Sequence, residues 1–446
     1  MEPDVRLKQS PKRRDFPRAV TPEETLARVV PLAKEVGITR LSDITGLDRL
    51  GIPVWSSVVP KSNDLLSTYN GKGTTHAAAK IGAIMEAVER HAAFTFERPF
   101  RRASYASIAA HRRAVDPATV CLALLPGYTK HTELLWTEGH DLFSGEEVLV
   151  PADLAGYNNR WSDNSSSRVF AIASSNGLAS GNTYEEAVAQ ALCEVVERDA
   201  WTVATILAHW VPRARFEAAR AKDGLPKLDW TEQEQPFSDD GDRYPIIEPS
   251  TLDGAPRDVY AKFARAGLAP TLRDITSDLG VPTFLASVRE QVSTDLPRAH
   301  IGLGTHPDSR VAVLRALTEA AQSRAVDIQG VREDMSTSAE STPKYMAHAQ
   351  RVARINDKCW LYVQTSRRKS FADVRFVRAT DTLDDIKWIL DSLRRCDLPL
   401  AVEVELTNPS IGIPVTRVIV PGLESWAADR GRIGRRGAKY WNANRS

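Results

Sequence analysis

Apolar residues recur along the chain at two spacings, one typical of helices and one typical of strands. Helical spacing between breaking residues predicts helices over about residues 21–36, 75–95, 256–266, 308–328 and 382–395. Alternating or β-branched runs predict strands over residues 53–60, 168–173, 271–276, 281–288, 398–406 and 413–422. This mixture of helices and strands predicts an α/β (α+β) fold.

One combination of turn and helix occurs more than once. Gly181–Thr183 suits a tight turn with a helix cap, and the helix behind it carries Glu194, Glu197 and Arg198 on one face. Gly73–Thr75 begins the same pattern 108 positions earlier, and the two copies align without a gap. A single Glu-x-x-Glu-Arg is typical of a solvated helix face. Repetition in register favours a shared structural or chemical role instead.

A third and weaker copy contains Arg315, Glu319 and Gln322. A length of 446 residues suggests two or three domains. Three related strand–turn–helix repeats whose carboxylates meet at one site would instead join most of the chain into one unit.

The repeats carry five carboxylates that would repel one another if they were gathered without cations. They are Glu86, Glu89, Glu194, Glu197 and Glu319. Oxygen ligands without His or Cys favour Mg²⁺, which in proteins usually also binds phosphate. Lys72 lies between two glycines before a helix and can face the same phosphates, although the sequence is not a Walker A loop. The residues therefore favour a magnesium–nucleotide site, and a structural charge network remains the alternative.

Composition excludes several classes of protein. A net charge of +1 predicts no strong field, so charge alone implies neither nucleic-acid nor membrane binding. Four scattered cysteines are too few for a disulfide framework or a CxxC metal site. Residues 1–20 lack the apolar core of a secretory signal, and no apolar run reaches the ~18 residues of a membrane span. We therefore expect a cytoplasmic protein.

The repeats and their turns resemble those of the YcaO family over roughly residues 45–425. The matching motifs are Gly71-Lys72-Gly73 with Glu86-x-x-Glu89-Arg90, Ser175–Thr183 with Glu186 and Glu194-x-x-Glu197-Arg198, and Gly304-Thr305-His306-Pro307 with Arg315-x-x-x-Glu319. The resemblance implies a YcaO-type fold around a central ATP and Mg²⁺ site. It also implies that ATP phosphorylates a backbone amide oxygen of a peptide, so that a nucleophile can add to the carbonyl carbon.

The resemblance also assigns residues to roles. The implied metal ligands are Glu86, Glu89, Glu194, Glu197 and Glu319. The implied nucleotide and phosphate contacts are Arg18, Thr25, Lys72, Asn182, Glu186, Arg198 and Arg315, of which Lys72, Arg198 and Arg315 are expected to act in catalysis. Ala179 stands where the family often has Ser, so that hydroxyl contact is not expected here.

The residue pattern and the resemblance together divide the chain into four parts. They are a flexible basic segment over residues 1–20, an N-terminal helix within 21–45, a catalytic domain over 46–428 and a basic tail over 429–446. The tail is expected to be a solvated end.

The identity of the nucleophile is the remaining question. Azoline-forming relatives use a Cys, Ser or Thr side chain of the substrate, and many end in a Pro-rich tail that acts in catalysis. This sequence ends Tyr440–Ser446 without such a tail, no fused leader-binding domain is expected, and Val415–Glu424 resembles the branch that works with TfuA-type partners. That branch places external sulfide in a backbone amide, so thioamide formation is preferred over azoline or amidine formation.

The expected partners are a peptide or protein substrate, a TfuA-like protein and a sulfur donor. A homodimer is an arrangement that the sequence leaves open. A function of another class also stays open, namely a non-enzymatic ATP-binding scaffold that activates a partner enzyme.

Overall fold

The computed structural model describes residues 6–13, 17–60, 67–97, 101–157, 169–171, 174–226, 243–291, 297–330, 361, 365–429 and 432–445. Within these residues the strands form three sheets. The three-stranded sheet has the order β1 (Arg40–Asp43), β2 (Val54–Val58), β3 (Thr68–Lys72), with antiparallel neighbours. The five-stranded sheet has the order β11 (Pro297–Thr305), β10 (Thr283–Gln291), β9 (Thr271–Asp274), β8 (Ile246–Ile247), β12 (Arg368–Lys369).

The six-stranded sheet contains strands from both halves of the chain. Its order is β4 (Arg101–Ser104), β5 (Glu133–Asp141), β13 (Val402–Glu405), β14 (Val415–Ile419), β7 (Leu178–Ser180), and β6 (Glu147–Pro151) pairs with β5. The late strands β13 and β14 therefore lie between β5 and β7. The C-terminal part of the chain thus completes a sheet that the N-terminal half begins.

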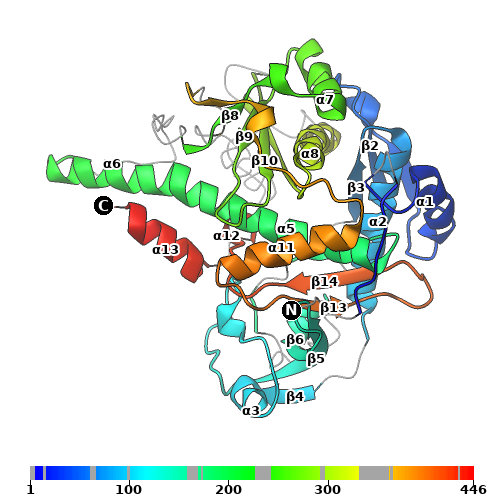
Figure 1. The fold of residues 1–446 in the computed structure, drawn as a ribbon, viewed down its shortest axis with the longest axis vertical. Helices are drawn as coiled ribbons and strands as arrows, with labels where there is room; N and C mark the ends of the chain where they lie inside the picture. Colours follow the sequence, from blue (N-terminus) through cyan, green and yellow to red (C-terminus); the bar gives the residue numbers. More distant parts are fainter. Residues whose placement is uncertain are drawn as a thin grey trace, which may run out of the picture.

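Three long helices each follow a strand at the end of its sheet. They are α2 (His76–Thr95) after β3, α5 (Tyr184–Thr205) after β7 and α8 (Ser309–Gly330) after β11. The side chains of Thr75 and Thr183 cap α2 and α5 by accepting backbone N–H groups three residues on. Figure 1 shows α5 crossing the molecule between the part that holds α7 and α8 and the part that holds β4 to β6.

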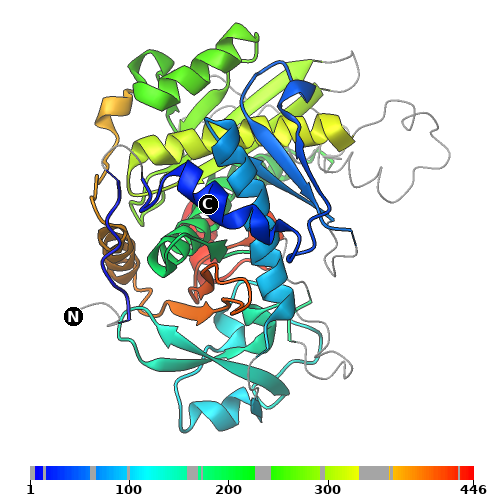
Figure 2. The same ribbon diagram turned by 90° about the vertical axis from the view of Figure 1, so that its right-hand side faces the viewer.

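The remaining helices cover these layers. They are α1 (Pro22–Val29), α3 (Tyr105–Ala109), α4 (Ala152–Ala155), α6 (Val211–Lys222), α7 (Gly254–Arg265), α11 (Thr382–Arg395), α12 (Trp426–Asp429) and α13 (Arg435–Asn444). A π-helical turn, Ile206–Trp210, joins α5 to α6, and 3₁₀ turns occur at Pro31–Ala33, Thr45–Leu47, Pro117–Thr119, Pro249–Thr251 and Phe371–Asp373. In Figure 2, α1 lies across α2. None of the helices described is both long enough and apolar enough to cross a membrane.

Most of the predicted elements are present, and two need correction. The helix predicted over 21–36 ends at Val29, because Pro31 cannot donate a helical hydrogen bond and a 3₁₀ turn follows. The strand predicted over 168–173 is wrong for the residues described there, where Phe170 forms only an isolated bridge with Leu124. The strand that leads into the second carboxylate helix is β7, which pairs with β14.

The two basic ends make specific contacts that their composition did not predict. Ser10 N donates to Asp381 Oδ1 at 2.9 Å, and Lys12 forms an ion pair with buried Asp385, so the described part of the N-terminal segment is fixed along α11. The tail, expected to be a solvated end, instead forms α13, and Arg436 Nε donates to buried Asp199 at 2.9 Å. In both places a basic side chain neutralises a buried carboxylate.

Candidate active site

A cavity of about 840 Å³ lies where α2, α5 and α8 come together. All twelve residues that the sequence assigned to metal or nucleotide binding line it: Arg18, Thr25, Lys72, Glu86, Glu89, Asn182, Glu186, Glu194, Glu197, Arg198, Arg315 and Glu319. We call this the carboxylate cavity. Its volume is within the ~300–1,000 Å³ typical of small-molecule sites.

Glycines in the strands allow two of the glutamates to approach backbone groups. A Cβ atom added at Gly71 would overlap the backbone oxygen of Ala79 on α2, and one at Gly304 would overlap that of Ala312 on α8. The strands can therefore lie against these helices only because both residues lack a side chain. As a result Asn70 N donates to Glu86 Oε2 at 3.0 Å, and Leu303 N donates to Glu319 Oε1 at 3.2 Å.

Glu89 connects α2 to the six-stranded sheet. Its Oε1 accepts hydrogen bonds from Ser180 N at 2.9 Å and from Ser180 Oγ at 2.7 Å. Burial raises the pKa of Glu89 to about 8 against the effect of these bonds, and repulsion from Glu86 and Glu194 adds to the rise. The carboxyl is thus held in a place where its negative charge is poorly compensated.

The glutamates of α5 are in a similar environment. Burial, and then repulsion from Glu319, raise the pKa of Glu197 to about 7. Burial also raises the pKa of Glu194, although Arg198, Arg417 and Arg90 act in the opposite direction. Neighbouring guanidinium groups therefore neutralise this cluster only in part.

The Lys72 side chain is the cation closest to these glutamates, and it forms an ion pair with Glu319. Although burial opposes it, the charges of Lys72 and Arg198 hold the pKa of Glu319 below its usual value. Arg198 lies 3.7 Å from Glu194, and the i,i+4 pair Arg90–Glu86 has the same separation.

Among the residues that the structure describes, no three His, Cys, Asp or Glu side chains are arranged to hold a metal ion. Glu86, Glu89 and Glu319 are bound instead to backbone N–H groups, to Ser180 and to Lys72. Their chemistry nevertheless fits Mg²⁺, because all the donors are oxygens and the buried negative charge lacks sufficient counter-charge. Rotation of these side chains toward the cavity centre would present them to an ion.

The N-terminal residues close the side of the cavity next to the start of α5. Glu186 accepts hydrogen bonds from Ala19 N at 2.7 Å and from Asn182 N at 3.1 Å, and Arg18 lies 3.3 Å from it. Thr25 Oγ1 donates to Asn182 Oδ1 at 3.0 Å. Four of the predicted nucleotide contacts therefore form one connected group, separate from the five glutamates: Arg18, Thr25, Asn182 and Glu186.

Arg315 lies on α8 and contacts the strand before it. Its Nη1 donates to Thr305 O at 2.9 Å. The side chain is half-buried and lines the carboxylate cavity, so its charge lies beside the ligand space.

Arg417 and Tyr157, which lie beside the site, were not predicted from the sequence. Arg417 on β14 is only 4% exposed, and its guanidinium lies 5.9 Å from the ring centroid of Tyr157. Arg90 approaches the same ring at 5.6 Å. The available signal was one charged residue in the run Val415–Val420, whose other members are Thr416 and apolar residues, because a strand buried on both faces rarely contains a charge.

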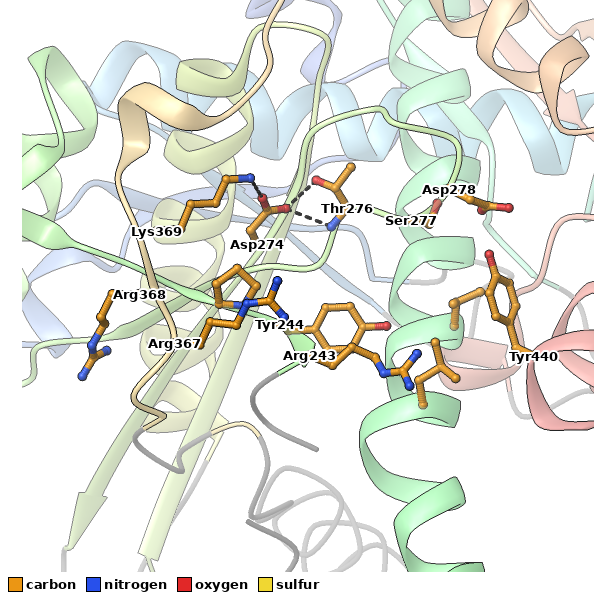
Figure 3. Close-up of a pocket in the computed structure, with 13 residues that line it drawn as sticks. Arg243, Tyr244, Asp274, Thr276, Ser277, Asp278, Arg367, Arg368, Lys369 and Tyr440 are labelled. Atoms are coloured by element: carbon orange, nitrogen blue, oxygen red, sulfur yellow. Dashed lines mark hydrogen bonds and ion pairs between the residues drawn. The ribbon is translucent and has the colours of Figure 1, made fainter. Parts of the chain in front are cut away.

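A second large cavity, of about 540 Å³, lies beside the C-terminal half of α5 (Figure 3). Lys369 Nζ lies 2.7 Å from Asp274, and Thr276 N donates to the same carboxylate at 3.0 Å. Asp278, also in this lining, forms an ion pair with Arg436. We call this the basic cavity, because Arg243, Arg367, Arg368 and Lys369 line it. None of the twelve predicted site residues is in its lining.

Comparison with known families gives one match over most of the chain. A family model described as YcaO cyclodehydratase, ATP- and Mg²⁺-binding, matches residues 70–424. A protein of Methanothermobacter thermautotrophicus is 36% identical over 428 residues, which are 94% of this chain and 98% of that protein. A protein from the tfuA 3′ region of Rhizobium leguminosarum bv. trifolii is 34% identical over 413 residues, covering 91% of this chain and 88% of its own.

Solved structures share the fold. The YcaO protein from Methanopyrus kandleri, bound with AMPPCP and Mg²⁺, has a TM-score of 0.64 and 25% identity, covering 94% of this chain and 95% of that one. A heterocyclase in complex with substrate and cofactor has a TM-score of 0.71 and 22% identity over 95% of this chain, but this chain spans only 54% of its length. By the family match and these relatives, the chain belongs to the YcaO family of ATP- and Mg²⁺-binding proteins.

Proposed function

We propose that the protein replaces the oxygen of a peptide backbone amide with sulfur, using ATP, Mg²⁺ and external sulfide. The observation that carries the ATP-dependent part is the convergence of five glutamates with Lys72, Arg198 and Arg315 around one cavity. The preference for sulfide is supported by the relative in the tfuA 3′ region, which is similar over 91% of this chain.

Different residues of the carboxylate cavity would bind different parts of the Mg²⁺–nucleotide ligand. Glu86, Glu89, Glu194, Glu197 and Glu319 would hold Mg²⁺, which when bound neutralises phosphate oxygens. Lys72 is paired with Glu319, so its charge becomes available to phosphate once that carboxylate turns to the metal. The group around Glu186 and Asn182 would bind the rest of the nucleotide, and Arg198 and Arg315 would stabilise the negative charge that moves during phosphoryl transfer.

The chemistry needs activation because an amide is a weak electrophile and its oxygen leaves poorly. Hydrosulfide adds to the carbonyl carbon, and the oxygen takes the γ-phosphoryl group of ATP. The C–O bond then breaks, phosphate leaves, the C=S bond forms and the S–H proton passes to solvent. Amide, hydrosulfide and ATP thus become thioamide, ADP and phosphate.

No cysteine nucleophile of the protein is required. Cys193 is 2% exposed, and burial raises the pKa of its thiol to about 11, which keeps it protonated at neutral pH. Cys193 is therefore a packing residue rather than a nucleophile. In the proposed reaction the nucleophile comes from the substrate or from solution.

α13 lies away from the carboxylate cavity. Its residues Arg436 and Tyr440 lie at Asp199 and the basic cavity, and no residue of α13 lines the carboxylate cavity. Azoline or amidine formation is the alternative chemistry, and a non-enzymatic ATP-binding scaffold is the alternative class.

Mass spectrometry distinguishes these functions. The protein is incubated with ATP, Mg²⁺, sulfide and the peptides encoded beside its gene, and phosphate release is followed in parallel. Exchange of one oxygen for sulfur supports the proposal, whereas loss of one water supports azoline formation. ATP binding without peptide-dependent phosphate release would favour the scaffold.

A further inference from the structure

A small third cavity, of about 50 Å³, lies beside the carboxylate cavity. Its lining is mostly apolar, including Leu122, Leu154, Val195 and Ile419, but it also contains Arg417 and Asn176. The volume is several times the ~10–15 Å³ that one water molecule needs. The cavity can therefore hold a ligand somewhat larger than water, but not a nucleotide or a peptide.

Arg417 brings a buried positive charge with a free donor to this cavity. The side chain is 4% exposed, and its Nη2 donates to the backbone oxygen of Ser174. Within the described residues, neither Arg417 Nε nor Asn176 Oδ1 has a hydrogen-bond partner. A buried donor on a cation is costly to leave unsatisfied. This pair of unmatched polar atoms points to a ligand.

The small cavity shares a wall with the carboxylate cavity. Ser174 and Asn176 line the small cavity, whereas Ser175 between them lines the large one. On α5, Val195 faces the small cavity and the adjacent Glu194 faces the large one. A molecule held at Arg417 is therefore separated from the nucleotide space by a single backbone turn.

We propose that this cavity binds hydrosulfide, the nucleophile of the proposed reaction. Hydrosulfide is a small monovalent anion with weak hydration, so an apolar cavity with one guanidinium suits it. Phosphate is larger and more highly charged, and a water molecule would accept the hydrogen bond without balancing the charge. The inference rests on the proposed thioamide function, since only that reaction uses sulfide.

The cavity would hold hydrosulfide next to the site of the reaction. In the reaction the sulfur lone pair forms the C–S bond and the carbonyl π electrons move to oxygen. That oxygen takes the γ-phosphoryl group of ATP, phosphate departs with the C–O electrons, and the S–H proton goes to solvent as C=S forms. Arg417 is thus a binding residue for the nucleophile rather than for ATP.

Binding of sulfide can be measured without a peptide. Anaerobic equilibrium dialysis with [³⁵S]sulfide is run on the full-length protein, on R417M and on N176D. Asn176→Asp is nearly isosteric and places a carboxylate opposite Arg417, so it tests the cavity even if R417M folds poorly. K369M, which changes a lysine of the basic cavity, is the matched control.

We expect one saturable sulfide site per chain, with affinity lowered by about tenfold or more in R417M and N176D and unchanged in K369M. The inference would be overturned if the unmodified protein bound no sulfide, or if R417M and N176D bound sulfide as tightly as the unmodified protein.

Two further measurements separate this inference from the proposed function. Crystals soaked in bromide, a monovalent stand-in with anomalous signal, should show a peak beside Arg417 Nε, and a water molecule there instead contradicts the assignment. If sulfide binds at Arg417 but no peptide gains sulfur, the thioamide function fails while the site stands. If thioamide forms and both cavity variants keep the KM for sulfide and change only the KM for ATP, Arg417 merely positions Glu194 and this inference fails alone.

Discussion

The carboxylate cavity and the basic cavity both contain buried or half-buried charges, but they neutralise them differently. In the basic cavity Lys369 and Thr276 contact Asp274 (Figure 3). Arg436 of α13 pairs with Asp278, so each of these two acids has its own local partner. In the carboxylate cavity burial raises the pKa of Glu89 to about 8 and that of Glu197 to about 7.

This difference separates a structural charge network from a ligand site. A network that only stabilises the fold pairs its charges, because an uncompensated buried charge is costly. The carboxylate cavity retains excess negative charge on three helices that come from distant parts of the chain. The excess is accounted for if cations arrive with the nucleotide, so the comparison favours the ligand site over the structural alternative.

The largest expected effect comes from removing one charge of the carboxylate cavity. Glu194→Gln or Glu197→Gln should lower peptide-dependent phosphate release by about 10²–10³-fold, the order seen when one group that stabilises a transition state is lost. Thermal unfolding should show that both variants fold. Asp274→Asn in the basic cavity is the matched control and should leave turnover unchanged. Undiminished turnover in both glutamate variants would remove the assigned metal role.

The second effect concerns the ion pair between α5 and α13, Asp199 with Arg436. Arg436→Ala leaves Asp199, which is fully buried, without its cation, and should lower the free energy of unfolding by about 3–5 kcal/mol. Urea unfolding measures this. The double variant D199N/R436M removes both charges and should recover much of the loss. A change below about 1 kcal/mol in R436A would show that the pair behaves like an exposed one.

Sequence predicted the carboxylate helices well because their ends carry local signals. Thr75 and Thr183 cap α2 and α5 as expected, and the spacing of the glutamates fixes which face they share. The roles of Arg417 and Arg436 were not predictable in the same way. Their partners, Tyr157 and Asp199, lie hundreds of positions away along the chain, and no local pattern records such a contact.

The two basic ends illustrate the same limit. Arg6 and Lys12 look like charges of a solvated segment, yet they pair with buried Glu403 and Asp385. A local window cannot distinguish a lysine in water from a lysine that neutralises an acid on another element. The division of the chain into four parts stays a prediction, as do the individual roles of the site residues.

A smaller effect is expected for Lys72. Lys369 forms a similar ion pair in the basic cavity and serves as the control. Lys72→Met should raise the KM for ATP by about tenfold, because a charge-assisted contact to phosphate is lost. Lys72→Arg keeps the positive charge and should lower the KM for ATP part of the way back. Lys369→Met removes the partner of Asp274 and should leave the KM for ATP unchanged. Equal KM values for K72M and K369M would contradict the assignment of Lys72 to phosphate.

The smallest effect is a pH dependence. The pKa values of Glu89 and Glu197 are raised from the usual 4.5 to about 8 and about 7, so the metal-free protein loses stability as pH rises from about 4.5 to these values. Metal binds the ionised forms, so affinity for Mg²⁺–AMPPCP should rise several-fold, up to about tenfold, between pH 6 and 8 with release of protons. Calorimetry in buffers of different ionisation enthalpy counts the protons, and E89Q should reduce the dependence. An affinity independent of pH would argue against these glutamates as ligands.

The most direct test is a crystal structure with Mn²⁺, in place of Mg²⁺, and AMPPCP. The account predicts anomalous peaks between α2, α5 and α8, within the ~2.0–2.3 Å of glutamate oxygens that hard cations adopt, with the phosphates facing Lys72 and Arg315. Metal bound by none of the five glutamates, or a nucleotide seated in the basic cavity, would contradict it.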